Sequence, residues 1–397
     1  MTVDAMTPSG KNKSSGSIIN DPKVRGIFYQ AVTLIALALL IYWIVDNTVE
    51  NLRRANIASG FGFLNGRAGF DPGQKLIQFT SDSTYGRALL VGFTNTMLVA
   101  VTGIITATIL GFIVGIGRMS NNWLISRLSL AYVELFRNIP PLLVIFFWYS
   151  GVLAVLPQAR DAISLPFTMY LSNRGLAFPS PVFGDWAFLT FVALVIAIVA
   201  SVVLARWSSK RQMATGQTFP VLRSVAGLVI GLPLLVFLVT GAPLSFDYPV
   251  AGKFNLTGGS VIGPEFMSLF LALSFYTAAF IAEIVRAGIR GVSKGQTEAA
   301  HALGIRPSLT TRLVVVPQAM RIIIPPLTSQ YLNLTKNSSL AIAVGYADLV
   351  ALGGTILNQT GQSIEIVTIW IIVYLSLSLL TSVFMNWFNA KMALVER

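Results

Sequence analysis

A short stretch in the C-terminal third of the chain is rich in hydrogen-bonding side chains although the sequence around it is apolar. It contains Asn333, Thr335, Lys336, Asn337, Ser338 and Ser339. Lipid satisfies none of these groups, so they must face protein or water. A zwitterionic amino acid needs donors for its carboxylate and acceptors for its ammonium, and this stretch offers donors together with amide carbonyls. The stretch could therefore line a transport path. Alternatively, its polar side chains could pack against neighbouring helices.

Two pairs of opposite charges also fall in or beside apolar stretches. Glu134 and Arg137 are three residues apart, as are Glu283 and Arg286, so each pair can lie on one face of a helix. A charge at the centre of a bilayer costs at least ~2.5 kcal/mol, which makes such residues candidates for function. Glu134 and Arg137 suggest either a structural ion pair or a gate, with Arg137 contacting an anionic substrate. Glu283 and Arg286 are expected to brace the end of a helix.

Other kinds of chemistry find no support in the sequence. The chain has no cysteine and a single histidine, His301, without a second ligand at metal-binding spacing, so we predict no metal site and no catalytic residue. It also has no Gly-x-x-x-x-Gly-Lys-Ser/Thr stretch and cannot hold ATP phosphates in the manner of a P-loop. Clusters of carboxylates typical of a membrane-bound enzyme are missing as well. Energy for transport must therefore come from another polypeptide or from an ion gradient.

The composition predicts a membrane protein. Hydrophobic residues make up 54% of the chain and charged residues 11%, with a mean hydropathy of +0.71. Runs long enough to cross ~30 Å of hydrocarbon occur at about 27–45, 88–115, 129–153, 187–205, 223–240, 264–287, 324–346 and 364–387. Eight spans place both termini on one side of the membrane.

The distribution of basic residues orients these spans. Under this layout 18 Lys and Arg residues lie on the side of the termini and eight on the other, with Arg137 and Lys336 left out as intramembrane. The positive-inside rule makes the first side cytoplasmic. The net charge of +12 is thus a topology signal, and no basic patch interleaved with aromatic residues indicates nucleic-acid binding.

The chain divides into three predicted parts. Residues 1–25 are a disordered cytoplasmic tail, 26–87 hold the first span and an exported loop, and 88–397 form the main membrane domain. Within this last part, 154–262 is an enlargement with two extra spans, and 288–323 is a long cytoplasmic loop. Turn formers in the exported segments, at Asp71–Gly73, Pro179–Pro181 and Gly258–Gly259, predict ordered loops or small hairpins. These segments form either a platform on which a receptor protein docks or additional loops that cover the periplasmic mouth.

The long cytoplasmic loop is predicted to hold a short helix. Ala299, Ala300 and Leu303 are good helix formers, Glu298 is expected near the helix start, where the macrodipole favours an anion, and Gly304 is suited to the left-handed stop. The alternative, a helix lying on the bilayer, would require bulky apolar anchors. The predicted helix offers mainly alanine.

This loop resembles the Glu-Ala-Ala loop of ABC importer permeases, in which a short helix docks into the partner ATPase. The family pattern is Glu-Ala-Ala, three residues, Gly, nine residues, a hydrophobic residue, one residue and Leu-Pro. Val314 and Val316 stand here in the hydrophobic positions before Pro317. The resemblance assigns ATPase coupling to Glu298, Ala299, Ala300, Leu303, Gly304, Arg306 and Pro317.

Three further stretches resemble the polar amino-acid uptake permeases. They are Glu134–Pro141, which is similar to the family's Glu-x-Phe-Arg-x-x-Pro segment, Ala282–Ile289, and the span from Ile324 to Leu340. This chain has more spans and longer loops than the short five-span members of that family. The enlarged form is similar to the larger permeases of general L-amino-acid importers.

The resemblance implies an all-α membrane protein with a type I, MetI-like permease core in the bacterial inner membrane. It also implies two copies of an ATPase that binds ATP and Mg²⁺, a second homologous permease forming a heterodimer, and a periplasmic amino-acid-binding protein. The chain itself needs no cofactor and is not an enzyme in this interpretation. The main alternative is an ion-coupled secondary transporter, with Lys336 and Glu134 as coupling groups.

Overall fold

The computed structural model describes residues 22–54, 60–252 and 255–392. The predicted tail at 1–25 lies outside the described residues except for its last four positions, which belong to the first helix.

Long apolar helices make up most of the described chain. Six of them are long and apolar enough to cross a membrane: α1 (Pro22–Arg54), α2 (Tyr85–Gly117), α5 (Ala187–Thr215), α6 (Val221–Val239), α7 (Pro264–Arg290) and α12 (Ser363–Met392). Two bent pairs of helices bring the number within the described residues to up to eight, if each pair is one span. This arrangement agrees with the predicted helical fold of about eight spans.

The third predicted span, 129–153, is not one continuous helix. α3 (Trp123–Arg137) ends before Pro140, and α4 (Pro141–Phe146) continues into the π-helical η3 (Phe147–Leu153) at an angle of 110° to α3. The bend follows from Pro140 and Pro141, which have no N–H to continue the helical ladder. The predicted apolar run is thus present as a bent pair of helices.

The seventh predicted span, 324–346, is part of a longer and broken path. Helical structure begins at α9 (Pro307–Thr310) and η5 (Thr311–Val315) and runs through α10 (Val316–Asn337) and η6 (Ser338–Val344). Gly345 then adopts a left-handed conformation with φ +77°, and α11 (Leu349–Thr360) follows at 52°.

Small residues on α2 allow it to pack closely on α7. Gly111 and Gly115 are both buried on α2, and a Cβ at Gly115 would lie 2.8 Å from the carbonyl oxygen of Ala282. A Cβ at Gly111 would lie 2.5 Å from Cγ2 of Ile281. Glycine at a spacing of four thus brings the two backbones together, the usual solution for helices that meet within a membrane.

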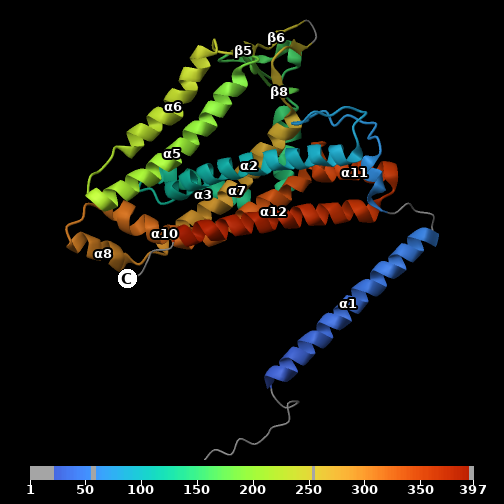
Figure 1. Ribbon diagram of the computed structural model, residues 1–397, viewed down its shortest axis with the longest axis horizontal. Helices are drawn as coiled ribbons and strands as arrows, with labels where there is room; N and C mark the ends of the chain where they lie inside the picture. The colour runs from blue at the N-terminus through green and yellow to red at the C-terminus, as the bar shows by residue number, and fades with distance from the viewer. Residues whose placement is uncertain (1–21, 55–59, 253–254, 393–397) are drawn as a thin grey trace, which may run out of the picture.

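The remaining bundle helices surround this pair. α3, α4 and α10 pack on α7, α11 packs on α2, and α12 packs on α10 and α11. Figure 1 shows α2, α7, α10 and α12 crossing as one bundle, with α8 (Lys294–Ala302) at one end and α11 toward the other. The main core cluster joins α2, α7, α10 and α12 through buried residues, among them the fully buried Leu269, Ile281 and Leu334.

The segments predicted as exported loops carry short antiparallel strands. β1 (Ile163–Leu165), β2 (Met169–Ser172), β3 (Gly175–Phe178) and β8 (Ser260–Ile262) form a sheet in the order β1-β2-β3-β8, while β4 (Ser180–Phe183) pairs with β5 (Leu244–Asp247) and β6 (Val250–Ala251) with β7 (Leu256–Thr257). The predicted turn at Gly258–Gly259 is confirmed by φ angles of +77° and +65°. Pro179 separates β3 from β4, and Ser180 and Pro181 lie in β4, where a two-stranded sheet leaves an edge that tolerates proline.

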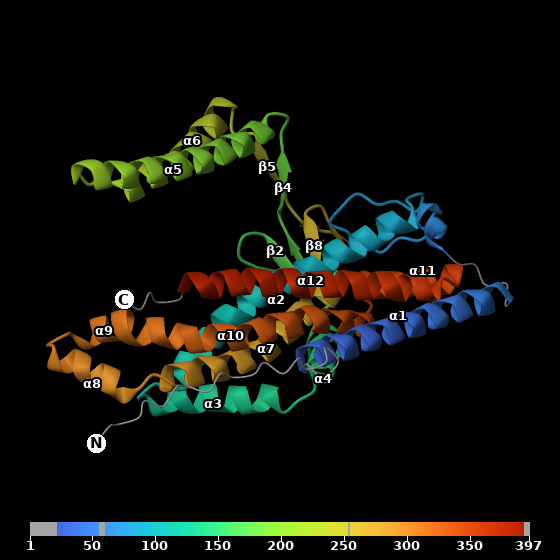
Figure 2. The same cartoon turned by 60° about the horizontal axis from the view of Figure 1, so that its bottom comes forward.

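The two extra spans form a helical hairpin. α5 and α6 pack on one another, and Figure 2 shows this hairpin standing apart from the bundle and joined to it through β4 and β5. The buried residues of α5 are all small: Ala193, Ala197, Ser201 and Ser208. We refer below to the end of the bundle next to these strands as the strand end and to the other as the α8 end.

Candidate functional site

The helix predicted in the long loop is present as α8, and Gly304 ends it as expected. Gly304 has φ +73°, and its N–H donates to the carbonyl of His301 at 2.9 Å. The N–H of Ile305 donates to the carbonyl of Ala300 at 3.1 Å. These two bonds form a Schellman motif, which needs a left-handed residue after the helix. A Cβ at Gly304 would meet nothing within 4 Å. Glycine is therefore favoured at this position by its left-handed backbone conformation and not by a lack of space for a side chain.

Most of the motif residues face outward. Glu298, Ala299, Gly304 and Arg306 are exposed and Leu303 is 79% exposed. Ala300 is buried beneath the helix, and Pro317 is half-buried in the first turn of α10.

The expected place of Glu298 at the helix start is wrong. α8 begins at Lys294 after Ser293, so Glu298 is its fifth residue and the first turn holds no acidic side chain. Its exposed carboxylate forms no ion pair with any described residue. Glu298 therefore does not cap the helix.

α8 is joined to both α7 and α10. Three residues, 291–293, separate it from α7, which extends to Arg290, and Gln318 of α10 donates through Nε2 to Oε1 of Gln296 at 3.2 Å. α7 and α10 are themselves in close contact, since a Cβ at Gly288 would collide with Ile323. A displacement of α8 would therefore act on both long helices.

The polar stretch near the end of α10 divides into two groups. Asn333 and Lys336 are exposed on one face of the helix, and Asn337 is half-buried. Ser338 is buried and donates to the carbonyl of Thr335 at 2.7 Å, while Ser339 donates to that of Lys336 at 2.8 Å. Both serine hydroxyls thus donate to backbone carbonyls of the same helical segment. The groups of this stretch that are available to another molecule are the amide of Asn333 and the ammonium of Lys336.

Glu134 and Arg137 do not form the predicted pair. Both are exposed at the end of α3, and no ion pair joins them. The guanidinium of Arg137 instead lies over the ring of Phe280 on α7, 5.7 Å from its centroid, where the negative face of the ring attracts it. The carbonyl of Glu134 accepts a hydrogen bond from Asn138 at 2.7 Å.

The predicted pair of Glu283 and Arg286 is confirmed, and it includes a third member. Nε of Arg286 lies 3.2 Å from both carboxylate oxygens of Glu283. Arg118, at the end of α2, also forms an ion pair with Glu283. Arg118 is one of the 18 basic residues predicted for the cytoplasmic side, and no local spacing in the sequence pairs it with a residue as distant as Glu283.

A buried polar cluster at the break before α11 also escaped the sequence analysis. Asp348 is fully buried and caps α11 by accepting from the N–H of Ala351 at 2.8 Å. Thr96 of α2 accepts from the N–H of Leu349 at 3.1 Å, and Tyr346 donates to the carbonyl of Asn95 at 3.1 Å. An aspartate directly before an apolar helical run was the available signal. The cluster fixes the break against α2.

Comparison with known proteins agrees with this architecture. Residues 197–394 match the family described as binding-protein-dependent transport system inner membrane component. The chain is 70% identical over 395 residues to the general L-amino acid transport system permease protein AapQ of Rhizobium johnstonii, covering 100% of this chain and 99% of that protein.

Two other relatives also match nearly end to end. The putative amino-acid ABC transporter permease protein YhdX of Escherichia coli is 50% identical over 97% of this chain and 98% of its own length. The glutamate/glutamine/aspartate/asparagine transport system permease protein BztB of Rhodobacter capsulatus is 42% identical over 96% of each chain. These relatives give no support to the alternative of an ion-coupled secondary transporter. The chain therefore belongs to the family of inner-membrane permease subunits of amino-acid ABC importers.

Proposed function

We propose that α8 is the element through which this permease subunit couples to a separate ATPase. The observation that carries the proposal is an exposed short helix, ended by Gly304 and joined directly to α7 and α10. Leu303, Leu309 and Leu313 are 79%, 44% and 63% exposed around it. Exposed leucines beside an acidic and several basic side chains suit a protein partner better than water. The ATPase would bind ATP and Mg²⁺, and we expect two copies.

The exposed polar groups of the bundle support a path shared with a second permease. Asn333 and Lys336 on α10 and Glu134 and Arg137 on α3 are exposed in the single chain. Lipid cannot satisfy them, so a partner permease and a water-filled path would cover them. The large strand-bearing enlargement favours a distinct partner, and hence a heterodimer.

The substrates are amino acids brought by a binding protein at the strand end. The names of the relatives support this class: one is a general L-amino acid permease and another serves glutamate, glutamine, aspartate and asparagine. In this orientation the α8 end and both termini are cytoplasmic, as the basic residues suggest.

Substrate-stimulated ATP hydrolysis tests the coupling role. The importer is purified with its ATPase and reconstituted, and the rate is measured with and without loaded binding protein. Gly304→Asp and Glu298→Lys should retain the membrane fold and abolish the stimulation. Gly295→Ala, which favours the helical conformation of α8 at a glycine without positive φ, is the control and should respond as the parent does. Normal stimulation in both the Gly304→Asp and the Glu298→Lys variant would refute the assignment.

A further inference from the structure

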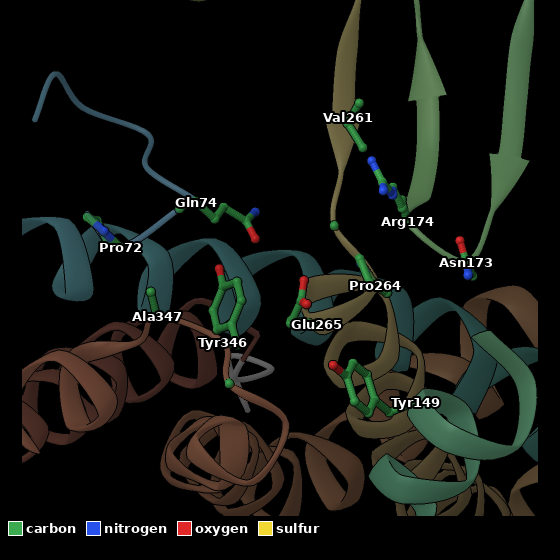
Figure 3. A pocket seen from close by; sticks show the side chains of 13 residues that line it. Pro72, Gln74, Tyr149, Asn173, Arg174, Val261, Pro264, Glu265, Tyr346 and Ala347 are labelled. Atoms are coloured by element: carbon green, nitrogen blue, oxygen red, sulfur yellow. The ribbon is translucent and has the colours of Figure 1, made fainter. Parts of the chain in front are cut away.

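A cavity of about 590 Å³ opens where the strands meet the helical bundle. Its lining comes from the loop before α2, the β2–β3 turn, the start of α7, η3 and the break before α11. Figure 3 shows Gln74, Glu265 and Tyr346 pointing into a common space, with Arg174 on the rim beside Val261. No residue assigned above to the path or to ATPase coupling lines this cavity.

One side of the cavity is fixed by Asn95 of α2. Its Nδ2 donates both to the carbonyl of Gln74, at 3.0 Å, and to the carbonyl of Ala347, at 2.8 Å. The loop before α2 is also braced by an ion pair of 3.0 Å between Lys75 and Asp71, and the hydrogen bond from Lys75 lowers the pKa of the Asp71 carboxyl. The loop and the break are thus held together before any ligand arrives.

The opposite side is fixed by strand pairing. β3 and β8 pair with Leu176 opposite Ile262, and Gly175 at the start of β3 has φ +108°. A Cβ at Gly175 would collide with the carbonyl of Ile262, so only glycine allows this approach. Arg174, directly before β3, and Glu265, in the first turn of α7, thus line the same cavity.

The lining carries one positive and one negative side chain, Arg174 and Glu265. Neither Arg174 nor Glu265 forms an ion pair with any residue that the structure describes. The rest of the lining is uncharged and includes the amides of Gln74 and Asn173 and the phenol of Tyr149, whereas the hydroxyl of Tyr346 already donates to the carbonyl of Asn95. An anion would use only the arginine and a cation only the glutamate, whereas a zwitterion uses both.

We propose that this cavity binds a free amino acid at the strand end of the permease, before the amino acid enters the path on α10. The guanidinium of Arg174 donates to the α-carboxylate, and Glu265 accepts from the α-ammonium. The substrate side chain occupies the remaining space beside Tyr346. The volume lies within the range of about 300–1,000 Å³ that is usual for small-molecule sites. The inference rests on the proposed amino-acid substrate and adds a second place where that substrate is held.

Equilibrium binding of radiolabelled L-glutamine tests the proposal. The complete importer, with its partner permease and ATPase, is placed in nanodiscs without the binding protein. Arg174→Gln and Glu265→Gln each remove a charge and keep a polar side chain of similar length. Each should weaken glutamine binding by about tenfold or more, the usual effect of losing a charge-assisted hydrogen bond. Arg160→Gln and Asp185→Asn remove the same charges from exposed residues outside the cavity and should leave binding unchanged.

Blocked ligands provide a second readout that does not depend on variants. N-acetyl-glutamine lacks the ammonium and glutamine amide lacks the carboxylate, so neither should compete with labelled glutamine at the cavity. Unchanged binding in both charge variants would overturn the proposal, and so would weakening in only one of them. Failure of the parent to bind glutamine while it imports glutamine normally would also overturn it. Absence of ATP-driven amino-acid uptake by the parent would instead overturn the proposed function.

Discussion

Arg118 on α2 and Glu283 on α7 form an ion pair although 165 residues separate them in the sequence. Arg286 shares the same carboxylate from within α7. The side chains of the three residues are only 11% to 24% exposed. One negative charge is therefore compensated by two positive charges that are largely shielded from solvent. The pair joins the two helices that form the centre of the bundle.

Glu283→Gln should therefore destabilise the permease more than the loss of either arginine. It leaves Arg118 and Arg286 facing each other without a counter-charge, and removing one partner of such a pair costs about 3 kcal/mol or more. Thermal unfolding of the purified protein in detergent, followed by size-exclusion chromatography, measures the shift. Arg160→Gln, which breaks the exposed pair with Asp161, is the control and should change the midpoint little. Equal midpoints for the two variants would contradict the structural role.

The contact between α2 and α7 predicts a difference between two glycines. Gly115→Val should prevent the bundle from assembling, because a Cβ there would lie 2.8 Å from the backbone oxygen of Ala282. Gly227→Val, in α6, should be tolerated because a Cβ there would meet nothing within 4 Å. The yield of monodisperse protein from membranes compares the two variants. Similar yields would show that α2 and α7 do not approach as closely as described.

The conformation of Gly304 predicts a graded effect on coupling. A left-handed backbone costs ordinary residues about 1–2 kcal/mol, and asparagine tolerates it best. Gly304→Asn should thus retain more substrate-stimulated ATPase activity than Gly304→Val. Gly295→Ala, within the same helix, should keep the parental rate because alanine favours a helix and Gly295 has no positive φ. If the asparagine and valine variants lost the same share of stimulated ATPase activity, the cause would be a steric clash of the new side chain with the partner and not the left-handed turn.

The cap of α11 predicts that Asp348 can be replaced by asparagine. Asn also accepts from the N–H at the helix start, so Asp348→Asn should unfold near the temperature of the parent. Asp348→Ala should lose about 1 kcal/mol of stability, as other N-caps do. Thermal unfolding in detergent separates the two. A fall as large for asparagine as for alanine would mean that the negative charge of Asp348 is itself required.

The absence of cysteine from the sequence allows the proposed path to be tested with single cysteines. Asn333→Cys should react with a water-soluble thiol reagent in the assembled importer, and substrate or ATP should change the rate. Leu334→Cys, fully buried beside it, and Leu379→Cys, exposed on the apolar helix α12, should both be unreactive. Reaction at Leu379 but not at Asn333 would place the aqueous path elsewhere.

The sequence by itself determined the membrane character, the number and approximate position of the spans, and the short helix that Gly304 ends. These features depend on apolar run length, local helix preference and a left-handed turn, all of which act within a few residues. The Glu283–Arg286 pair was predictable for the same reason, because three residues on a helix bring two side chains together.

Only the tertiary structure decided the features that join distant segments. Arg137 lies over Phe280 and not beside Glu134, Arg118 completes the ion cluster, and Arg174 and Glu265 line one cavity. Each depends on how two helices cross or how two strands pair across 82 or more residues. No periodicity in the sequence records such an approach, because it is set by small residues and buried volume at the contact itself.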